Sequence, residues 1–333
     1  MLYAKVDKKE AERTKSLLIR IGALADGAPV LHSDSYVLFP VYISSAKVKK
    51  LIESAAAGVV ERKTTAMGGK PEAAAPAVGY ELLGSIAIIE VPKGERRRER
   101  KIAESVMAAN RNIKTVLAKA GPVSGVYRTR KFRHIAGQRN CTAVLRENGC
   151  VFTFDVRKAF FSGRLSFERS RIASLVSGKE KVIVMFAGVG PFAIEIAKRH
   201  PKSTVVAIEL NRYAFACMRK NVAANRATNV TPVLGNVDSL ASKYRGFADR
   251  IVMPLPMSSR LHLGSALMMA KRRAVLHVYA FGSIGSAAGE LSRFVEARAK
   301  VGGRRARLVF SRKVRNYSAK EIEVVADFSV EAR

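Results

Sequence analysis

A glycine-rich turn followed by a distant glutamate is the feature of this sequence with the clearest chemical meaning. Residues 186–193 read FAGVGPFA, a G-x-G-x-x-A pattern between an apolar run and a helical pattern. Glycines in such a turn let the backbone approach a ligand closely. Glu209 follows Gly188 by 21 residues and ends the next apolar run, the spacing at which an acidic side chain reaches ribose hydroxyls. We therefore expect a cofactor that contains a nucleoside.

Two details near this turn separate the cofactors that use it. Nicotinamide dinucleotides and S-adenosylmethionine both bind to turns of this kind. Pro191, directly after the second glycine, removes one backbone N–H from the helix N-terminus where a pyrophosphate would bind. The segment 249–256, DRIVMPLP, ends a later apolar run, and the crevice at the carboxyl edge of a parallel sheet is where a reacting base would sit. Both details favour the methyl donor.

Asn236, in the segment 234–240 (LGNVDSL), has two interpretations. It follows the third apolar run of this half, where a side-chain amide can read an adenine edge through hydrogen bonds. Asparagine is also a common turn former, a role that needs no ligand. Both interpretations stay open at the level of sequence.

The second half of the chain alternates apolar strand patterns with helical patterns. Strict alternation of this kind predicts an α/β fold with a doubly wound, mostly parallel sheet. The expected strands are residues 182–186, 204–210, 231–235, 249–255 and 274–281, and the expected helices are residues 191–200 and 212–226.

Two smaller α/β modules are expected before this domain. Residues 1–64 contain two strand and two helix patterns, and residues 65–79, rich in Ala, Gly and Pro, have the composition of a flexible linker. Residues 80–150 open with an apolar strand at 84–92 and continue into a strongly basic helix predicted over 93–121. Residues 151–333 form the expected catalytic domain.

The composition predicts a globular protein that binds a polyanion. The chain has 333 residues, of which 48% are apolar, enough for two or three domains with a sizeable core. The formal net charge is +32 and the sequence pI is about 10.6. Nucleic acid is the expected partner, although a generally basic proteome or a high-salt cytoplasm is an alternative source of the excess charge.

Other classes of protein and of site are not supported. No stretch approaches the roughly 20 apolar residues of a membrane span, and the N-terminus lacks the apolar region of a signal peptide, so a cytoplasmic location is expected. The cysteines Cys141, Cys150 and Cys217 are odd in number without a C-x-x-C pair, and the five histidines are dispersed. Neither a disulfide framework nor a metal site is expected.

Several longer motifs make the chain resemble a known enzyme family. They are VSGVYRTRKFRHIAG (123–137), FDVRKAFFSGRLSFERSRIASLV (154–176), MFAGVGPFAIEIAK (185–198), AIELNRYAFACMRKNVAANR (207–226) and DRIVMPLP (249–256). With the N-terminal module, they resemble the archaeal and eukaryotic tRNA (guanine-37-N1)-methyltransferases over nearly the whole chain. The block ending in LSFERSRIA is the most specific, because generic methyltransferases lack it. The resemblance implies a Rossmann-like class I methyltransferase domain that uses S-adenosylmethionine.

By this resemblance, Arg128, Glu168 and Arg169 are the catalytic residues. Guanine N1 carries a proton at neutral pH, so a base must remove it while negative charge on O6 is stabilised. Glu168 is the expected general base, a role worth about 10² to 10⁴ in rate, and Arg128 is the expected partner of O6. Arg169 is expected to hold Glu168 or a neighbouring phosphate in place. Without the resemblance, Glu168 reads as an acidic residue that complements the dipole of a helix over 165–176.

The expected cofactor site shows some departures from the family pattern. It comprises Phe186, Ala187, Gly188, Gly190, Glu209, Leu210, Asn236, Val237 and Pro254. The Asn-Leu-Pro of the family is Pro254-Leu255-Pro256 here, a form that resembles an archaeal subgroup whose members also methylate a tricyclic wyosine precursor. Asn236 replaces the aspartate common near the adenine, and Phe160 stands where tyrosine is common.

The expected partner is tRNA, whose anticodon stem-loop binds to the basic surface and whose target base flips out into the pocket. The N-terminal module is expected to bind the tRNA elbow. A monomer is the default expectation.

Three alternative functions remain. An aminocarboxypropyl transferase of the wybutosine pathway is disfavoured by the retained Glu168-Arg169 pair, and a nicotinamide-dependent dehydrogenase by the charge. A non-catalytic RNA-binding protein on the same fold is disfavoured by the intact glycine turn.

Overall fold

A computed structural model describes residues 2–20, 30–33, 35–41, 52–54, 58–61, 79–91 and 96–332, together with residues 23 and 50. The chain divides into two compact units, Met1–Pro71 and Glu72–Arg333. The linker predicted over 65–79 lies outside the described residues except for Gly79. The domain limits at 64, 80 and 151 therefore stay predictions.

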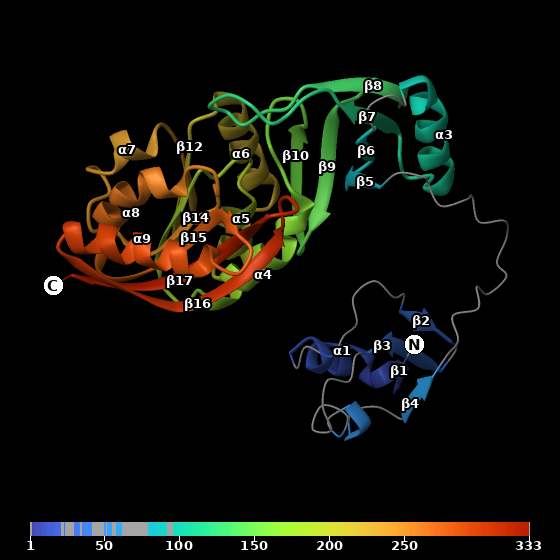
Figure 1. Ribbon diagram of the computed structural model, residues 1–333, viewed down its shortest axis with the longest axis horizontal. Coiled ribbons are helices and arrows are strands. Elements are labelled where there is room, and N and C mark those ends of the chain that lie inside the picture. The colour runs from blue at the N-terminus through green and yellow to red at the C-terminus, as the bar shows by residue number, and fades with distance from the viewer. Residues whose placement is uncertain are drawn as a thin grey trace. The chain divides into compact units, whose positions relative to one another are not determined.

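The described part of the first unit contains a four-stranded antiparallel sheet and helix α1 (Figure 1). β1 (Leu2–Asp7) pairs with β3 (Tyr36–Pro40) and with β4 (Gly58–Glu61), and β2 (Leu31–His32) pairs with β3. The Asp7 side chain accepts a hydrogen bond from the Lys9 backbone N–H (2.9 Å) and so begins the turn η1 (Lys8–Glu10) that leads into α1 (Ala11–Arg20). The small core contains Ala4, Val6, Leu18, Val37, Phe39 and Ile52.

The second unit begins with a four-stranded sheet of order β5-β6-β7-β8. Its elements are β5 (Tyr80–Leu83), β6 (Ile86–Ile89), the turn η2 (Arg96–Arg98), α3 (Glu99–Ala109), β7 (Thr115–Lys119) and β8 (Phe132–Gly137). The prediction of one helix over 93–121 is wrong in its second half, because the extended backbone of Asn110 (φ −139°, ψ 100°) ends α3. β7 lies between β6 and β8, with Val116 and Leu117 buried in different core clusters.

A hairpin follows this sheet. β9 (Thr142–Glu147) and β10 (Cys150–Asp155) are joined by Asn148 and Gly149, which both have positive φ (48° and 74°), as a tight type I′ turn requires. The backbone N–H of Thr153 donates to the side chain of Asn221 (2.9 Å) in α6 (Arg212–Ala224). This bond joins the hairpin to α6, which belongs to the large domain described next. The boundary expected at residue 150 falls within the hairpin.

Seven strands form the sheet of the largest domain, in the order β13-β12-β11-β14-β15-β17-β16. The first five in this order are parallel, and β17 runs antiparallel to both neighbours. The predicted fold class is confirmed, although the strands β16 and β17 were not predicted. The elements are η3 (Gly163–Leu165), α4 (Ser166–Leu175), β11 (Lys181–Met185), α5 (Pro191–Arg199), β12 (Thr204–Glu209), α6, β13 (Val230–Leu234), α7 (Val237–Leu240), β14 (Ala248–Met253), η4 (Ser259–His262), α8 (Leu263–Met269), β15 (Ala270–Ser283), α9 (Ala287–Val301), β16 (Arg304–Asn316) and β17 (Glu321–Ala332).

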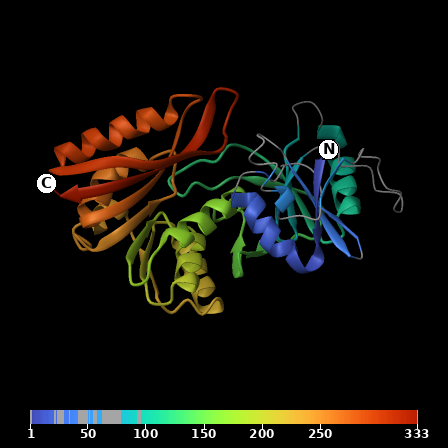
Figure 2. The same ribbon diagram turned by 90° about the horizontal axis from the view of Figure 1, so that it is seen from below.

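Helices lie on both sides of this sheet (Figure 2), and buried side chains form a core cluster on each of its faces. Along β11, Val182 and Val184 belong to one buried cluster, and Ile183 and Met185 belong to the other. Parallel strands with helices on both faces show this pattern, since every side chain of the strand is covered. The carboxyl ends of β11, β12 and β13 therefore meet at one edge of the sheet, where the glycine turn lies.

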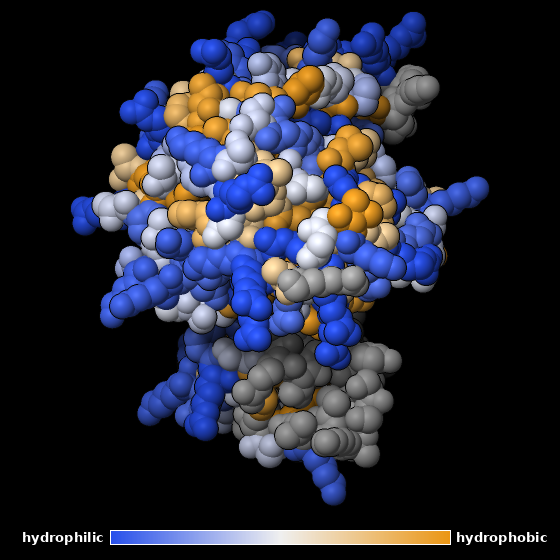
Figure 3. Space-filling model, turned by 90° about the vertical axis from the view of Figure 1, so that its left-hand side faces the viewer, coloured by the Kyte–Doolittle hydropathy of each residue, from blue (hydrophilic) through white to orange (hydrophobic). Residues whose placement is uncertain are grey.

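One face of the molecule mixes hydrophilic and apolar side chains. Figure 3, seen from the left-hand side of Figure 1, shows projecting hydrophilic side chains with apolar patches between them. No helix in the part of the chain that the structure describes is long and apolar enough to span a membrane. Within the same part of the chain, no group of three His, Cys, Asp or Glu side chains is arranged to hold a metal ion. Cys141, Cys150 and Cys217 are free thiols.

Candidate active site

The glycine turn joins β11 to α5 through Phe186, Gly188 and Gly190, which have positive φ (54°, 59° and 92°). Glycine is required at position 190, because a Cβ there would lie 2.9 Å from Met218 Cγ. Gly188 differs, since a Cβ built on it would meet no atom closer than Phe160 O at 3.9 Å. The backbone at Gly188 thus borders open space, which suits the close approach of a ligand.

Glu209, at the end of β12, turns its side chain toward this turn. Its Oε2 accepts a hydrogen bond from the Gly188 N–H (2.7 Å), and its Oε1 accepts one from the Asn211 N–H (2.7 Å). Burial raises the pKa of the Glu209 carboxyl, and the backbone N–H groups only partly oppose this effect. The structure thus brings together the two features that their spacing linked. Leu210, the next residue, is 37% exposed.

Asn236 is the N-cap of α7. Its side-chain oxygen accepts a hydrogen bond from the Asp238 N–H (2.8 Å), so it has the turn-forming role. Contact with an adenine stays a prediction for its amide. The next residue, Val237, is buried, and Pro254 is half-buried directly after β14.

Two further side chains near the glycine turn, Asp238 and His262, were not predicted. His262 Nδ1 lies 2.9 Å from Asp238 Oδ2, the hydroxyl of Ser265 donates to Asp238 Oδ1, and the His262 ring lies 5.0 Å from that of Phe186. Burial by itself would raise the pKa of Asp238, but its hydrogen bonds outweigh burial and lower it. These contacts tie α7 to η4 and α8 beside the turn, and no sequence motif signals them.

Glu168, the expected base, is buried in the first turn of α4, with 2% of its side chain exposed. Its Oε2 accepts hydrogen bonds from Arg171 Nε and from the Tyr279 hydroxyl, both at 3.0 Å. Burial and the charge of Glu168 raise the pKa of Tyr279, so this hydroxyl stays a donor. The other oxygen, Oε1, has no hydrogen-bond partner among the described residues, although Arg312 Nη1 forms an ion pair with it at 3.5 Å. A buried acceptor without a donor is costly unless a ligand brings one.

Arg169 does not hold Glu168, contrary to expectation. Its guanidinium pairs with both carboxylate oxygens of Glu147 (2.5 and 2.6 Å) and donates to Ser162 O (3.0 Å). It is 1% exposed, and its contact with an RNA phosphate stays a prediction. The holding role belongs to Arg171, because residues three apart share a helix face and adjacent residues do not.

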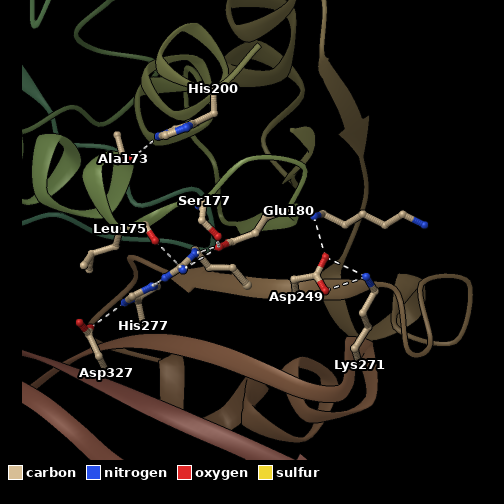
Figure 4. Close-up of polar contacts among 11 residues, drawn as sticks. Ala173, Leu175, Ser177, Glu180, His200, Asp249, Lys271, His277 and Asp327 are labelled. Carbon is tan, nitrogen blue, oxygen red and sulfur yellow. Dashed lines mark hydrogen bonds and ion pairs between the residues drawn. The ribbon is translucent and has the colours of Figure 1, made fainter. Parts of the chain in front are cut away.

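Arg171 begins a buried polar chain, whose part from Asp327 to Glu180 is drawn in Figure 4. Arg171 Nη1 donates to Asp327 Oδ2 (2.6 Å), and His277 Nδ1 lies 2.7 Å from Asp327 Oδ1. Arg250 Nη1 lies 2.7 Å from His277 Nε2, and Arg250 Nε donates to Glu180 (2.6 Å). Because arginine only donates, His277 Nε2 accepts and the ring proton is on Nδ1. Burial lowers the pKa of His277, in agreement with a neutral ring.

Arg128 lies in the long segment between β7 and β8, with positive φ (54°). Within the described residues its guanidinium has no hydrogen bond or ion pair, so neither interaction joins it to Glu168. This segment reaches toward the seven-stranded domain in both ribbon views (Figures 1 and 2). Lys119 lowers the pKa of Glu90, and Arg130 and Arg164 add to this effect. Arg130 belongs to this segment and Arg164 to η3, so charges from both elements act on the same carboxyl.

Three family models match consecutive parts of the chain. They are the tRNA methyltransferase 5 N-terminal domain over residues 5–49, the TYW2 N-terminal domain over residues 71–140 and the TRM5/TYW2 methyltransferase domain over residues 143–300. The Pyrococcus abyssi protein named tRNA (guanine(37)-N(1))-methyltransferase Trm5b is 31% identical, over 99% of this chain and 99% of that protein. The chain belongs to the TRM5/TYW2 methyltransferase family.

A second relative and a solved structure are also similar to this TRM5/TYW2 methyltransferase. The Saccharolobus solfataricus protein named tRNA 4-demethylwyosine(37)-methyltransferase Taw21 is 34% identical, over 60% of this chain and 76% of that protein. The crystal structure of Pyrococcus abyssi Trm5b matches with a TM-score of 0.71 and 31% identity, over 99% of both chains. The predicted family is thus confirmed, and the dehydrogenase alternative is removed. The roles of individual site residues stay predictions.

Proposed function

We propose that this TRM5/TYW2 methyltransferase transfers a methyl group from S-adenosylmethionine to N1 of guanine 37 in tRNA. The observation that carries the proposal is that Oε1 of buried Glu168 accepts no hydrogen bond from any residue that the structure describes. Tyr279 donates to Glu168 (3.0 Å), and its ring lies 6.0 Å from that of Phe192 in the first turn of α5. Tyr279 therefore connects Glu168 to the start of α5, the helix that follows the glycine turn. The family supports the cofactor and the substrate.

The reaction assigns a role to each group. Glu168 Oε1, which lacks a donor, accepts the N1–H hydrogen bond and takes the proton as N1 bonds to the methyl carbon. Arg128 stabilises the negative charge that develops on O6. When bound, the cofactor supplies an electrophilic methyl group on a sulfonium. Its ribose would meet Glu209, and its other contacts would come from Phe186, Ala187, Gly188, Gly190, Leu210, Asn236, Val237 and Pro254.

The identity of the product tests this proposal. An unmodified tRNA transcript with guanine at position 37 is incubated with the protein and S-adenosylmethionine, and its nucleosides are analysed by mass spectrometry. We expect 1-methylguanosine, and none with an adenine-37 transcript. An aminocarboxypropyl adduct would contradict the proposal and favour the aminocarboxypropyl transferase. The absence of any product would favour a non-catalytic RNA-binding protein.

A tricyclic wyosine precursor is a second candidate substrate. The Taw21 relative, named for 4-demethylwyosine, and Pro254 in place of the asparagine of the family favour it. A tRNA that carries 4-demethylwyosine at position 37 tests it in the same assay, where a mass increase of one methyl group is expected. Binding at the tRNA elbow, a monomeric state and a cytoplasmic location also belong to the proposal.

A further inference from the structure

Two exposed phenylalanine side chains lie next to Glu168 on separate elements. Phe167 in α4 is 54% exposed, and Phe310 in β16 is 41% exposed. The Arg312 guanidinium lies 4.4 Å from the ring centre of Phe167, and the Arg171 guanidinium lies 4.7 Å from that of Phe310. Both arginines also contact Glu168, at 3.5 Å and 3.0 Å. The two rings, the two cations and the carboxylate therefore form one cluster.

Protection of the sheet edge explains only part of this surface. β16 is an edge strand, and such strands commonly carry Lys or Arg to block pairing with other chains. Arg305, Arg307 and Lys313 fit this role, since they are exposed and form no ion pair within the described part of the chain. Exposed phenyl rings act in the opposite direction, because large apolar groups favour association. The rings need another explanation.

Single-stranded nucleic acid is bound by side chains of this kind. Bases stack on aromatic rings in a way that tolerates any sequence, and nearby cations pair with the phosphates. A guanine that reaches Glu168 must leave its stack, which uncovers the faces of the neighbouring bases. The cluster adjoins Glu168, so the rings are within reach of the nucleotide next to that guanine.

We infer that Phe167, Phe310 and Arg312, the α4–β16 platform, stack the nucleotide adjacent to the target guanine. The inference rests on the proposed function, because it needs a guanine at Glu168. Arg312 lies against both the Phe167 ring and Glu168 Oε1. It therefore stands at the border between the platform and the reacting base, where its charge suits the phosphate that joins the two nucleotides.

Stacking is measured with anticodon stem-loop RNAs that carry 2-aminopurine on one or the other side of the target guanine. Its fluorescence reports whether the base is stacked. The variants are Phe167→Ala, Phe310→Ala, their double variant and the ring-preserving Phe167→Tyr. The matched control is Phe294→Ala in α9, since Phe294 is 38% exposed and its ring centre lies 5.5 Å from the Arg260 guanidinium.

We expect each alanine variant to raise KM for RNA about tenfold, with kcat within about twofold of the parent. The fluorescence change of the neighbouring 2-aminopurine should disappear in the double variant and persist in Phe167→Tyr and Phe294→Ala. An unchanged KM and fluorescence response in the double variant would overturn the inference. So would a dimer of the parent protein in sedimentation that the double variant lacks, since the surface would then bind a second copy. Parent protein that methylates no RNA would instead refute the proposed function.

Discussion

Glu168 depends on side chains from three segments of the chain. Arg171 comes from the same helix, Tyr279 from β15 and Arg312 from β16. Among the described residues, Oε2 accepts two hydrogen bonds and Oε1 accepts none, so Oε1 is the oxygen left to accept one from a substrate. A carboxylate held in this way before the substrate arrives needs little rearrangement during the reaction.

Tyr279→Phe is expected to lower kcat about tenfold without changing KM for RNA, because Glu168 loses a donor that fixes its orientation. The ring and its packing against Phe192 remain, so the free energy of unfolding should fall by only about 1 kcal/mol. Steady-state kinetics and denaturant unfolding measure both quantities. Tyr213→Phe is the matched control, since it removes a hydroxyl that accepts from the Asp155 N–H (2.8 Å). An equal loss of kcat in the control would contradict the positioning role.

The neutral ring of His277 predicts a pH dependence of stability. Burial lowers its pKa in the folded protein, so near pH 6.5 only the unfolded chain takes up a proton. The stabilisation is complete above about pH 6.5 and decreases as the pH falls, by up to about 1.4 kcal/mol per pH unit. Denaturant unfolding between about pH 5 and pH 8 measures it. His277→Gln should flatten this slope, and an unchanged slope would contradict the assignment.

Asp327 extends the same dependence to lower pH. Burial by itself would raise its pKa, but hydrogen bonds and charges from His277 and Arg171 outweigh burial and lower it. Its contribution is therefore present above about pH 4 and is lost as the pH falls further.

At the scale of elements, long apolar runs could be predicted and contacts between distant segments could not. The parallel strands are buried on both faces, so each gives a clear apolar signal. The sequence predicts helix for β7 because Leu117 and Ala118 are good helix formers only a few residues after α3, whereas pairing with β6 and β8 decides their conformation. In the site, the 21-residue spacing between Gly188 and Glu209 predicted that these two residues serve the same cofactor. Arg171, Tyr279 and Asp238 act through tertiary contacts that have no local pattern.

Gly188 and Gly178 provide a matched pair for the turn that joins β11 to α5. Both have similar positive φ (59° and 53°), and a Cβ would meet nothing closer than 3.9 Å at either position. Alanine at either position should therefore cost about 1 to 2 kcal/mol of stability. Only Gly188→Ala is expected to weaken S-adenosylmethionine binding, about tenfold or more, because its methyl group occupies the ligand side of the turn. Calorimetric titration measures this, and equal affinities would contradict the location of the cofactor site.

At the scale of the whole molecule, the net charge of +32 predicts RNA binding that depends steeply on salt. Contacts with phosphates release counterions, so raising the salt concentration from about 50 to about 200 mM should weaken tRNA affinity about 100-fold. S-adenosylmethionine affinity should change less than about twofold, since no phosphate is involved. Fluorescence anisotropy measures the RNA affinity. An affinity that does not respond to salt would leave the charge as a general property of a basic proteome.

The single-turnover rate of methyl transfer to a guanine-37 tRNA transcript, compared between the parent protein and Glu168→Gln, bears on the reaction itself. Glutamine keeps the size of the side chain and an oxygen for Tyr279 and Arg171, but it does not take up the N1 proton. With both substrates saturating, the rate should fall about 10² to 10⁴-fold, and the affinities for tRNA and S-adenosylmethionine should stay unchanged. A rate within about threefold of the parent would contradict proton removal by Glu168.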